Sequence, residues 1–291
     1  MIIDLKYHIA SLAAVFLALG IGILIGTTMI GSDVIMKQQE RLVMNLQQEF
    51  VSLREENRRT AAALAAMQED LAYQQQFNRE VLPVLVQGRL QGRKVALVDL
   101  NYRKEHDGLV NVLRTAGAEV QSVTVVNLSA LRNPETSSRV AVFLGREREA
   151  PPDRYLPDLA RTLARALLTG EASELTGFLE EQEIVRISGA YGVAPHDVIL
   201  IGGGKGKDQD YAKPFDLVLI KTWQSYGLRV FGVEDSRVSV SYMRYYQSAG
   251  LTTVDNIDTV YGQVALVRAM GGYPGHYGIK ETAEAFIPPL E

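Results

Sequence analysis

An apolar run near the N-terminus dominates the hydrophobic pattern of the chain. No charged side chain occurs from Ile9 to Ser32. A helix of that length spans about 36 Å, at roughly 1.5 Å per residue, which exceeds the ~30 Å hydrocarbon core of a bilayer. A single isolated run can satisfy its backbone in lipid only as a helix. The pattern therefore predicts one transmembrane helix within residues 1–32, preceded by a short N-terminal tail.

This segment has two interpretations, a cleaved signal peptide and an uncleaved signal anchor. A signal peptide has an apolar core of about 7–15 residues, followed by small residues at a cleavage site. Here the run is longer, and Thr27–Asp33 contains no Ala-x-Ala site. The signal anchor is therefore preferred. Flanking charges barely discriminate orientation, but a short tail before a first apolar helix usually stays inside. We expect a single-pass cell-membrane protein with its C-terminal domain outside the cytoplasm.

A row of small residues runs along the predicted anchor. The row recurs at every fourth position and ends in a Gly-xxx-Gly pair: Ala10, Ala14, Ala18, Gly22 and Gly26. Helices in lipid associate by close packing rather than by burying apolar surface, and small side chains permit that approach. The row favours dimerisation, although alanine and glycine are common in membrane helices in any case.

Heptad spacing of apolar residues follows the anchor, from about Met36 to Val81. With Met36 at position a, the later a positions are Val43, Phe50, Asn57, Leu64, Leu71 and Asn78. The d positions are Gln39, Leu46, Leu53, Thr60, Met67, Gln74 and Val81. Such a repeat is typical of a parallel coiled coil, which we predict over residues 33–83. We expect it to stop at Pro83, because proline cannot donate a backbone hydrogen bond.

Asn57 indicates which partner the predicted coiled coil would have. Two asparagines at matching a positions can pair in a parallel dimer, and a shift in register would leave them unpaired. Glu49 at g and Arg54 at the following e would also attract each other across such a dimer. The alternative is a single amphipathic helix folded back on the globular domain. We prefer a homodimer because the small-residue row of the anchor favours the same parallel geometry.

Short apolar runs alternate with helical patterns over residues 84–291. Strands are expected at residues 94–100, 119–126, 139–144, 198–201 and 228–233. Helices are expected at residues 109–116, 156–168, 174–182, 215–226 and 260–270, with a loop at 251–258 and a turn at 271–277. Continuous apolar strands alternating with helices indicate a mainly parallel sheet that is covered on both faces. The fold class is therefore α/β, with a Rossmann-like globular domain.

The composition and motifs of the chain argue against several kinds of functional site. The formal net charge is -4, so no general basic field indicates nucleic acid as a partner. The chain has no cysteine, which excludes disulfides, thiolate metal sites and thiol nucleophiles. No Gly-x-Ser-x-Gly elbow occurs. We expect a protein without catalytic activity, resident metal or cofactor.

A glycine-rich loop after a predicted strand is the best candidate for small-molecule binding. It consists of Gly202, Gly203, Gly204, Lys205, Gly206 and Lys207. It fails the phosphate-loop pattern because Ile201 stands in place of the first glycine and Asp208 in place of the magnesium-binding hydroxyl. The dinucleotide-binding pattern fails at Lys207. We expect a mobile basic loop and keep a weak anion site as the alternative.

Other polar and aromatic groups are weaker candidates. Four carboxylates near predicted strand ends could hold a hard cation: Glu234, Asp235, Asp255 and Asp258. A solvated or helix-capping role is preferred for them. The histidines (His8, His106, His196 and His276) share no close spacing and are expected at the surface or in loops. The segment Tyr242–Tyr246 is expected to form either a partner-binding face or a buried strand edge.

The C-terminal segment from Leu251 to Val267 resembles a signature of the copper transporter MctB family, which includes SteB-like envelope proteins. The resemblance is carried by Thr253, Val254, Asp255, Asn256, Asp258, Thr259 and Gly262. The segments Leu5–Gly20, Gly275–Lys280 and Ile287–Leu290 are similar to the two ends of the family. The resemblance covers essentially the whole chain.

The resemblance implies an envelope protein with an anchor, a coiled coil and an α/β domain. The family name implies copper transport or copper homeostasis, and SteB-like members imply a SteA-type partner that resembles thiamine pyrophosphokinase. The residues speak against a literal copper channel, because one span cannot enclose a pore unless many copies assemble. Copper(I) favours thiolate and thioether ligands, yet cysteine is absent and the methionines form no close cluster in the globular domain.

These observations favour a membrane-anchored, dimeric, non-catalytic protein that presents an α/β recognition domain to envelope partners. Copper transport or homeostasis is the alternative. A second alternative is an extracytoplasmic domain that binds a nucleotide or a sugar phosphate at Gly202–Lys207.

Overall fold

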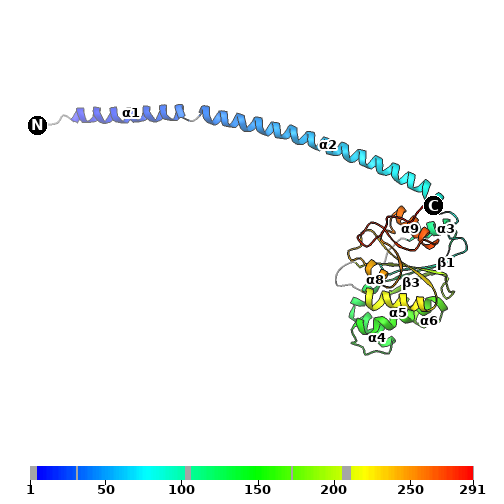
Figure 1. The fold of residues 1–291 in the computed structure, drawn as a ribbon. Helices are drawn as coiled ribbons and strands as arrows, with labels where there is room; N and C mark the ends of the chain where they lie inside the picture. The colour runs from blue at the N-terminus through cyan, green and yellow to red at the C-terminus, as the bar shows by residue number, and fades with distance from the viewer. Residues whose placement is uncertain (1–4, 31, 102–105, 172, 205–210, 291) are drawn as a thin grey trace. The chain divides into compact units, whose positions relative to one another are not determined.

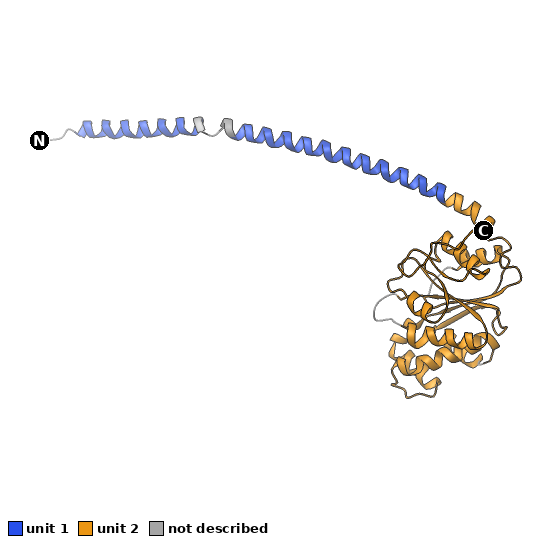
Figure 2. Ribbon diagram, viewed as in Figure 1, with its two compact units in different colours: residues 1–74 blue, residues 75–291 orange. Residues whose placement is uncertain are grey.

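The computed structural model divides into two compact units, Met1–Gln74 and Gln75–Glu291 (Figure 2). It describes residues 5–30, 32–101, 106–171, 173–204 and 211–290. The first unit holds helix α1 (Leu5–Ile30) and most of helix α2 (Ser32–Val86). The last turns of α2 belong to the second unit, which contains all of the β-strands among the described residues (Figure 2).

Helix α1 is apolar on every side. Its large side chains are exposed, Leu12, Phe16 and Leu24 by 62–69%, and the helix is long and apolar enough to cross a membrane. The expected N-terminal apolar helix is thus confirmed. The small-residue row lies on this helix, and a Cβ atom added at Gly22 or Gly26 would meet nothing within 4 Å. No contact within the chain therefore requires glycine at these two positions.

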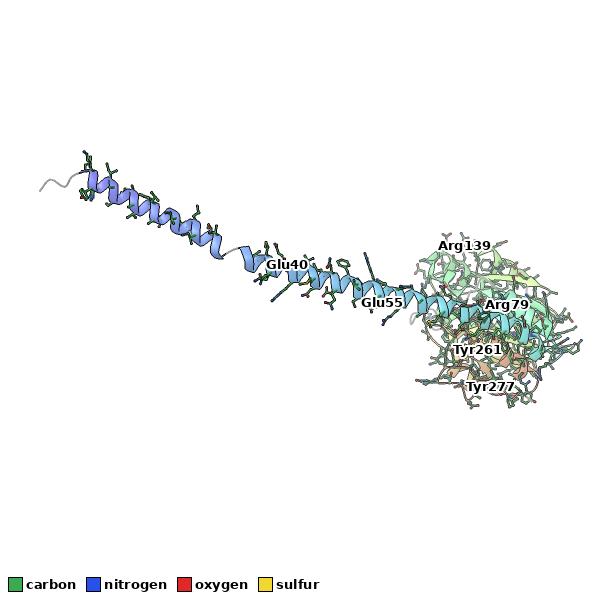
Figure 3. The ribbon with its side chains drawn as sticks, turned by 90° about the horizontal axis from the view of Figure 1, so that it is seen from above. Glu40, Glu55, Arg79, Arg139, Tyr261 and Tyr277 are labelled. Atoms are coloured by element: carbon green, nitrogen blue, oxygen red, sulfur yellow. The ribbon has the colours of Figure 1, made fainter. Side chains whose placement is uncertain are left out.

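Most of the apolar residues of helix α2 are exposed. Side chains at the expected a and d positions, such as Val43, Phe50 and Leu53, are 53–60% exposed in the single chain. Polar side chains, including the labelled Glu40 and Glu55, project outward around the same helix (Figure 3). The expected long helix is confirmed, and its pairing with a second helix remains a prediction.

The expected stop at Pro83 is wrong, because α2 continues to Val86. The amide of Gln87 donates to the carbonyl of Pro83 at 2.9 Å, so the helical bonding resumes directly after the proline. Val86 is completely buried, and Leu82 and Leu85 pack against the same core. Burial of these side chains offsets the hydrogen bond that Pro83 cannot make.

One seven-stranded sheet forms the centre of the second unit, in the order β3-β2-β1-β4-β5-β6-β7. The strands are β1 (Lys94–Asp99), β2 (Glu119–Val126), β3 (Val185–Gly189), β4 (Asp197–Gly202), β5 (Arg229–Glu234), β6 (Thr252–Val254) and β7 (His276–Tyr277). Only the β2–β3 pair is antiparallel among these strands. The expected mainly parallel sheet is confirmed.

Helices cover both faces of the sheet, as parallel strands that are apolar on both sides require. One face is covered by α4 (Pro134–Phe143), α5 (Pro152–Thr169), α6 (Ser173–Glu181), α7 (Leu217–Ser225) and α8 (Met243–Ser248). The other face is covered by α3 (Asp107–Thr115), α9 (Val260–Met270) and the end of α2. Figure 1 shows α3 and α9 on one side of the sheet and α4, α5 and α6 on the other.

The strand expected at residues 139–144 is wrong, since this segment ends helix α4. The side chain of Asn133 caps the helix by accepting hydrogen bonds from the amides of Glu135 (2.9 Å) and Thr136 (3.4 Å). Pro134 occupies the first helical position, where its missing N–H costs nothing. Val140 and Ala141 are buried while Val142 is exposed. The cap and the adjacent buried pair favour helix over the β-forming tendency of the segment.

Three strands were not expected from the sequence. Strand β3 pairs only at the edge of the sheet and buries little besides Val185. Strands β6 and β7 lie within the segments expected to be a loop (251–258) and a turn (271–277), and they contain three and two residues. Such short strands have no periodicity of their own, so pairing with neighbours defines them.

Candidate functional site

The carboxyl ends of β1, β2, β4 and β5 border a cleft. The chain runs outward from β1 to β2 in one direction and from β4 to β5 in the other. Loops diverge at such a reversal of strand order, and open α/β sheets usually bind ligands there. This end of the sheet is therefore the first place to look for a site in the described part of the chain.

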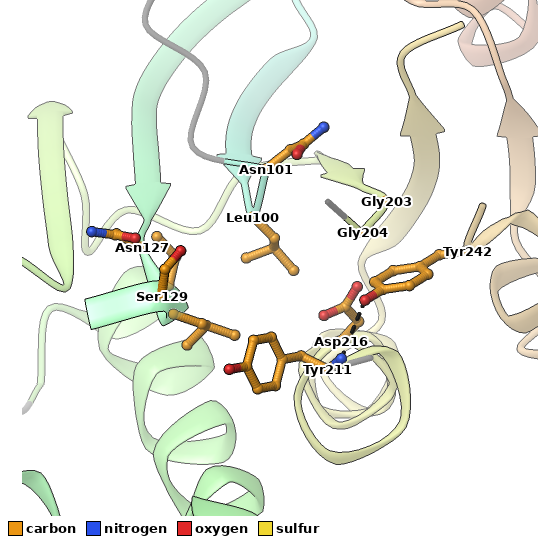
Figure 4. A pocket seen from close by; sticks show the side chains of 11 residues that line it. Leu100, Asn101, Asn127, Ser129, Gly203, Gly204, Tyr211, Asp216 and Tyr242 are labelled. Carbon is orange, nitrogen blue, oxygen red and sulfur yellow. Dashed lines mark hydrogen bonds between the residues drawn. The ribbon is translucent and has the colours of Figure 1, made fainter. Parts of the chain in front are cut away.

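Two adjoining hollows make up this cleft. The smaller, of ≈ 30 Å³, is lined by Leu100, Asn101, Val126, Asn127, Leu128, Ser129, Gly203, Gly204, Tyr211, Asp216 and Tyr242 (Figure 4). The larger, of ≈ 380 Å³, is lined by Asn101, Gly204, Asp235, Arg237, Val238, Ser239 and Asp258. Because both include Asn101 and Gly204, they are neighbouring parts of one feature, called here the carboxyl-edge cleft.

A buried tyrosine–carboxylate pair lies behind the smaller hollow. The hydroxyl of Tyr246 donates to Oδ2 of Asp216 at 2.5 Å, and both side chains are almost completely buried. Burial raises the pKa of Tyr246 well above its usual value, and the adjacent Asp216 carboxylate adds to the increase. The Tyr246 hydroxyl therefore keeps its proton and serves as a fixed donor to Asp216.

Packing explains the described part of the glycine-rich loop. A Cβ atom at Gly202 would lie closer than 3.0 Å to the Tyr246 ring, and Gly203 has a φ of +104° that disfavours other residues. Gly204 forms an antiparallel bridge to Val240, with backbone hydrogen bonds of 2.8 and 3.1 Å. Close approach of residues 238–246 thus accounts for all three glycines. Lys205, Gly206 and Lys207 lie outside the described residues.

The carboxylates expected to be solvated or helix-capping are mostly buried and bonded within loops. Glu234 has no exposed surface and accepts hydrogen bonds from the Ser241 hydroxyl (2.6 Å), the Tyr242 amide (2.9 Å) and Lys280 Nζ (2.6 Å). Asp255 accepts from the amides of residues 279 and 280. The expectation was wrong because the sequence did not show that residues 275–285 return to these strand ends.

Asp258 has a similar structural role, since it accepts hydrogen bonds of 2.7 Å from both the amide and the hydroxyl of Ser236. Asp235 is half-buried at the edge of the cleft, and its carbonyl oxygen accepts a hydrogen bond from Lys280 Nζ. Within the described residues, no group of three or more histidines, aspartates or glutamates is placed to hold a metal ion.

The residues of the C-terminal signature meet where β6 leads into α9. Thr259 caps α9 by accepting from the amide of Gly262 (3.1 Å), and its hydroxyl donates to the carbonyl of Asn256 (2.7 Å). A Cβ atom at Gly262 would lie closer than 3.0 Å to that same carbonyl. Thr253 contacts Nδ1 of His276 at 3.1 Å, and Val254 is buried in the core. These residues hold a tight strand-to-helix turn together.

His276 lies half-buried in strand β7 rather than at the surface or in a loop, whereas His106 lies in the loop before α3, as expected, but is not a surface residue. His106 is mostly buried, and its Nε2 lies 2.7 Å from Oδ2 of Asp99 at the end of β1. His196 accepts a hydrogen bond from the Lys94 amide through Nδ1, and His8 is exposed on α1. The pair of Asp99 and His106 was missed in the sequence, although a carboxylate that ends a buried strand could have indicated it.

The segment Tyr242–Tyr246 is not a strand edge, and most of its side chains are buried. Its last four residues begin helix α8, and Tyr242, Met243 and Tyr246 are buried beneath the cleft. Tyr242 accepts a hydrogen bond from the Tyr211 amide through its hydroxyl oxygen (3.2 Å), as Figure 4 shows. Aromatic spacing alone did not distinguish a short buried helix from an exposed face.

A family model described as "Copper transport outer membrane protein, MctB" matches residues 2–288. The match extends over nearly the whole chain, through both compact units, and it confirms the resemblance seen in the sequence. No curated protein matches the chain.

Proposed function

Because the chain belongs to the MctB family of copper transport outer membrane proteins, we propose that it is an envelope protein anchored by α1 and dimerised through α1 and α2. In this proposal α1 is a single-pass anchor, and the α/β domain is a Rossmann-like, non-catalytic recognition domain outside the cytoplasm. A SteA-type protein that resembles thiamine pyrophosphokinase is the proposed envelope partner.

The exposed heptad row of α2 is the observation that supports this proposal. Its apolar members are about half to two-thirds exposed: Val43, Leu46, Phe50, Leu53, Leu64, Met67 and Leu71. A helix with such a row gains stability when a second helix covers it. A second copy is the natural partner because Asn57 then faces Asn57 at position a, and the small-residue row of α1 permits the same parallel approach.

Cysteine cross-linking tests the dimer directly, since the natural chain has no cysteine. Leu53→Cys places a thiol at a d position, where the two copies of a parallel dimer come close enough for a disulfide. We expect this variant of the full-length protein to oxidise mainly to a covalent dimer in membranes. Non-reducing electrophoresis measures the dimeric fraction.

Gln48→Cys is the matched control, because position 48 lies at f on the opposite side of the heptad. It should remain largely monomeric under the same oxidation. Equal cross-linking of the two variants, or monomer alone from both, would contradict a dimer with this register.

Copper transport or homeostasis is the second candidate, and the family match is the observation that favours it. If the protein handles copper, deletion of its gene should change copper sensitivity, and the full-length gene should restore it. Growth across a series of copper concentrations measures this, with zinc as the control for general metal stress. Unchanged copper sensitivity in the deletion strain would reject this candidate and leave the dimer proposal untouched.

A further inference from the structure

The carboxyl-edge cleft presents polar side chains that the fold does not use. In the described part of the chain, no residue forms a hydrogen bond with the side chains of Asn101, Ser129, Tyr211, Arg237 or Ser239, all of which line the cleft. These side chains come from the segments after β1, β2, β4 and β5. Figure 4 shows three of them, Asn101, Ser129 and Tyr211, around the smaller hollow.

Three of the neighbouring acidic groups, by contrast, are bonded to other side chains of the protein. Glu234 is paired with Lys280, Asp258 is bonded by Ser236, and Asp216 accepts from Tyr246. The side chain of Asn127, which also lines the smaller hollow, has no hydrogen bond within the described residues either. The unused groups are therefore two amides, three hydroxyls and one guanidinium. Amides and hydroxyls both donate and accept hydrogen bonds, as ligand hydroxyls require. A guanidinium only donates, and its geometry suits a phosphate or a carboxylate.

Tyr211 is suited to act as a neutral hydrogen-bonding group. Burial raises the pKa of its hydroxyl, and Asp153 adds to the increase while Arg132 opposes it. The hydroxyl therefore keeps its proton near neutral pH and can donate to a ligand oxygen.

The size of the cleft fits a small ligand. Its larger hollow, at ≈ 380 Å³, falls within the range of about 300–1,000 Å³ that is usual for small-molecule sites. The smaller hollow, at ≈ 30 Å³, has room for about one water molecule or one ligand substituent. Their place at the reversal of strand order is also the usual one for ligands of open α/β sheets.

We propose that the carboxyl-edge cleft binds a hydroxyl-rich small molecule with one acidic group, the chemistry that sugar phosphates and sugar acids share. Arg237 contacts the acidic group, and Asn101, Ser239 and Tyr211 contact the hydroxyls. The site shares no residue with the proposed dimer contacts of α1 and α2, and it requires no glycine-rich phosphate loop.

Saturation-transfer difference NMR on the full-length protein in detergent tests this site. The probes are glucose 6-phosphate, glucuronate, glucose and inorganic phosphate, each titrated separately. We expect saturable binding of one or both of the first two probes, with weaker binding of glucose and of phosphate. The two acidic probes distinguish a sugar phosphate from a sugar acid as the preferred ligand.

Single substitutions test whether the probes bind in the carboxyl-edge cleft. Arg237→Gln should weaken binding of the preferred acidic probe about tenfold, because glutamine cannot make the charge-assisted hydrogen bonds that a guanidinium donates to an acidic group. Asn101→Ala should also weaken the binding of that probe. Arg148→Gln is the matched control, because Arg148 is exposed and lies outside the cleft. This variant should bind the probe as tightly as the natural protein does.

Three results would overturn the proposal. These are no saturable binding of either acidic probe, binding that neither cleft variant weakens, and phosphate or glucose alone binding as tightly as the acidic sugar. None of them depends on the outcome of cysteine cross-linking or copper sensitivity, so this site and the proposed function can fail independently.

Discussion

Replacing Glu234 with alanine is expected to lower the free energy of unfolding of the α/β unit by about 3 kcal/mol. Removing one partner of a buried ion pair typically costs about 3–5 kcal/mol. Glu234 has no exposed surface, whereas Lys280 is 20% exposed, so water relieves part of the cost and the lower value applies. The change also removes the acceptor for the Ser241 hydroxyl and the Tyr242 amide.

Denaturant unfolding followed by tryptophan fluorescence measures this effect. Trp223 is the single tryptophan of the chain, and it is 1% exposed within the α/β unit, so its emission reports on that unit. Glu281→Ala is the matched control, because Glu281 is 95% exposed and 3.9 Å from Arg244. The control should leave the unfolding midpoint unchanged. Equal midpoints for Glu234→Ala and the control would show that the buried network around Glu234 does not stabilise the unit.

Gly262→Ala is expected to lower the free energy of unfolding by about 2–3 kcal/mol, at the upper end of the usual cost of overpacking. Alanine normally stabilises a helix relative to glycine by about 1 kcal/mol. Here the added methyl group would meet the backbone carbonyl of Asn256, which the Thr259 cap holds in place. Since backbone on both sides of the contact is constrained, the turn must distort.

Gly108→Ala is the matched control for this prediction. Gly108 lies in the first turn of α3, and a Cβ atom there would meet nothing within 4 Å. It should stabilise the unit by about 0.4–1 kcal/mol, opposite in sign to Gly262→Ala. The same fluorescence assay measures both changes. If Gly262→Ala were also stabilising, the close approach of α9 to Asn256 would not be the reason for glycine in the signature.

The local sequence pattern was sufficient to predict some helices and strands and insufficient to predict others. Strand β2 and helix α9 begin and end at the residues expected, because β-branched residues favour the strand and Thr259 and Gly271 mark the two ends of the helix. Helix α4 was mistaken for a strand because its end, residues 139–144, is rich in β-forming residues while its Asn133 cap lies further upstream. Strands β6 and β7 are too short to show a period at all.

The candidate site was predicted less well than the fold. The glycine run at residues 202–204 does lie at the carboxyl end of a strand, as the sequence indicated. Its glycines are nevertheless explained by close contacts with Tyr246, Val238 and Val240. The polar groups of the cleft come from four separate loops, such as those that hold Asn101 and Arg237. No spacing along the chain relates the four loops, so only the strand order brings them together.

The sequence by itself determined the apolar N-terminal helix, the long heptad helix, the α/β class and the family resemblance. Each of these follows from periodicity or from contiguous residues, which are local properties. Only the tertiary structure decided that α2 continues past Pro83, that Glu234 and Asp255 are buried by the returning C-terminal segment, and that a polar cleft forms at the carboxyl ends of the strands. These features depend on burial and on hydrogen bonds between residues far apart in the chain. A local sequence pattern gives no information about the free energies of such contacts.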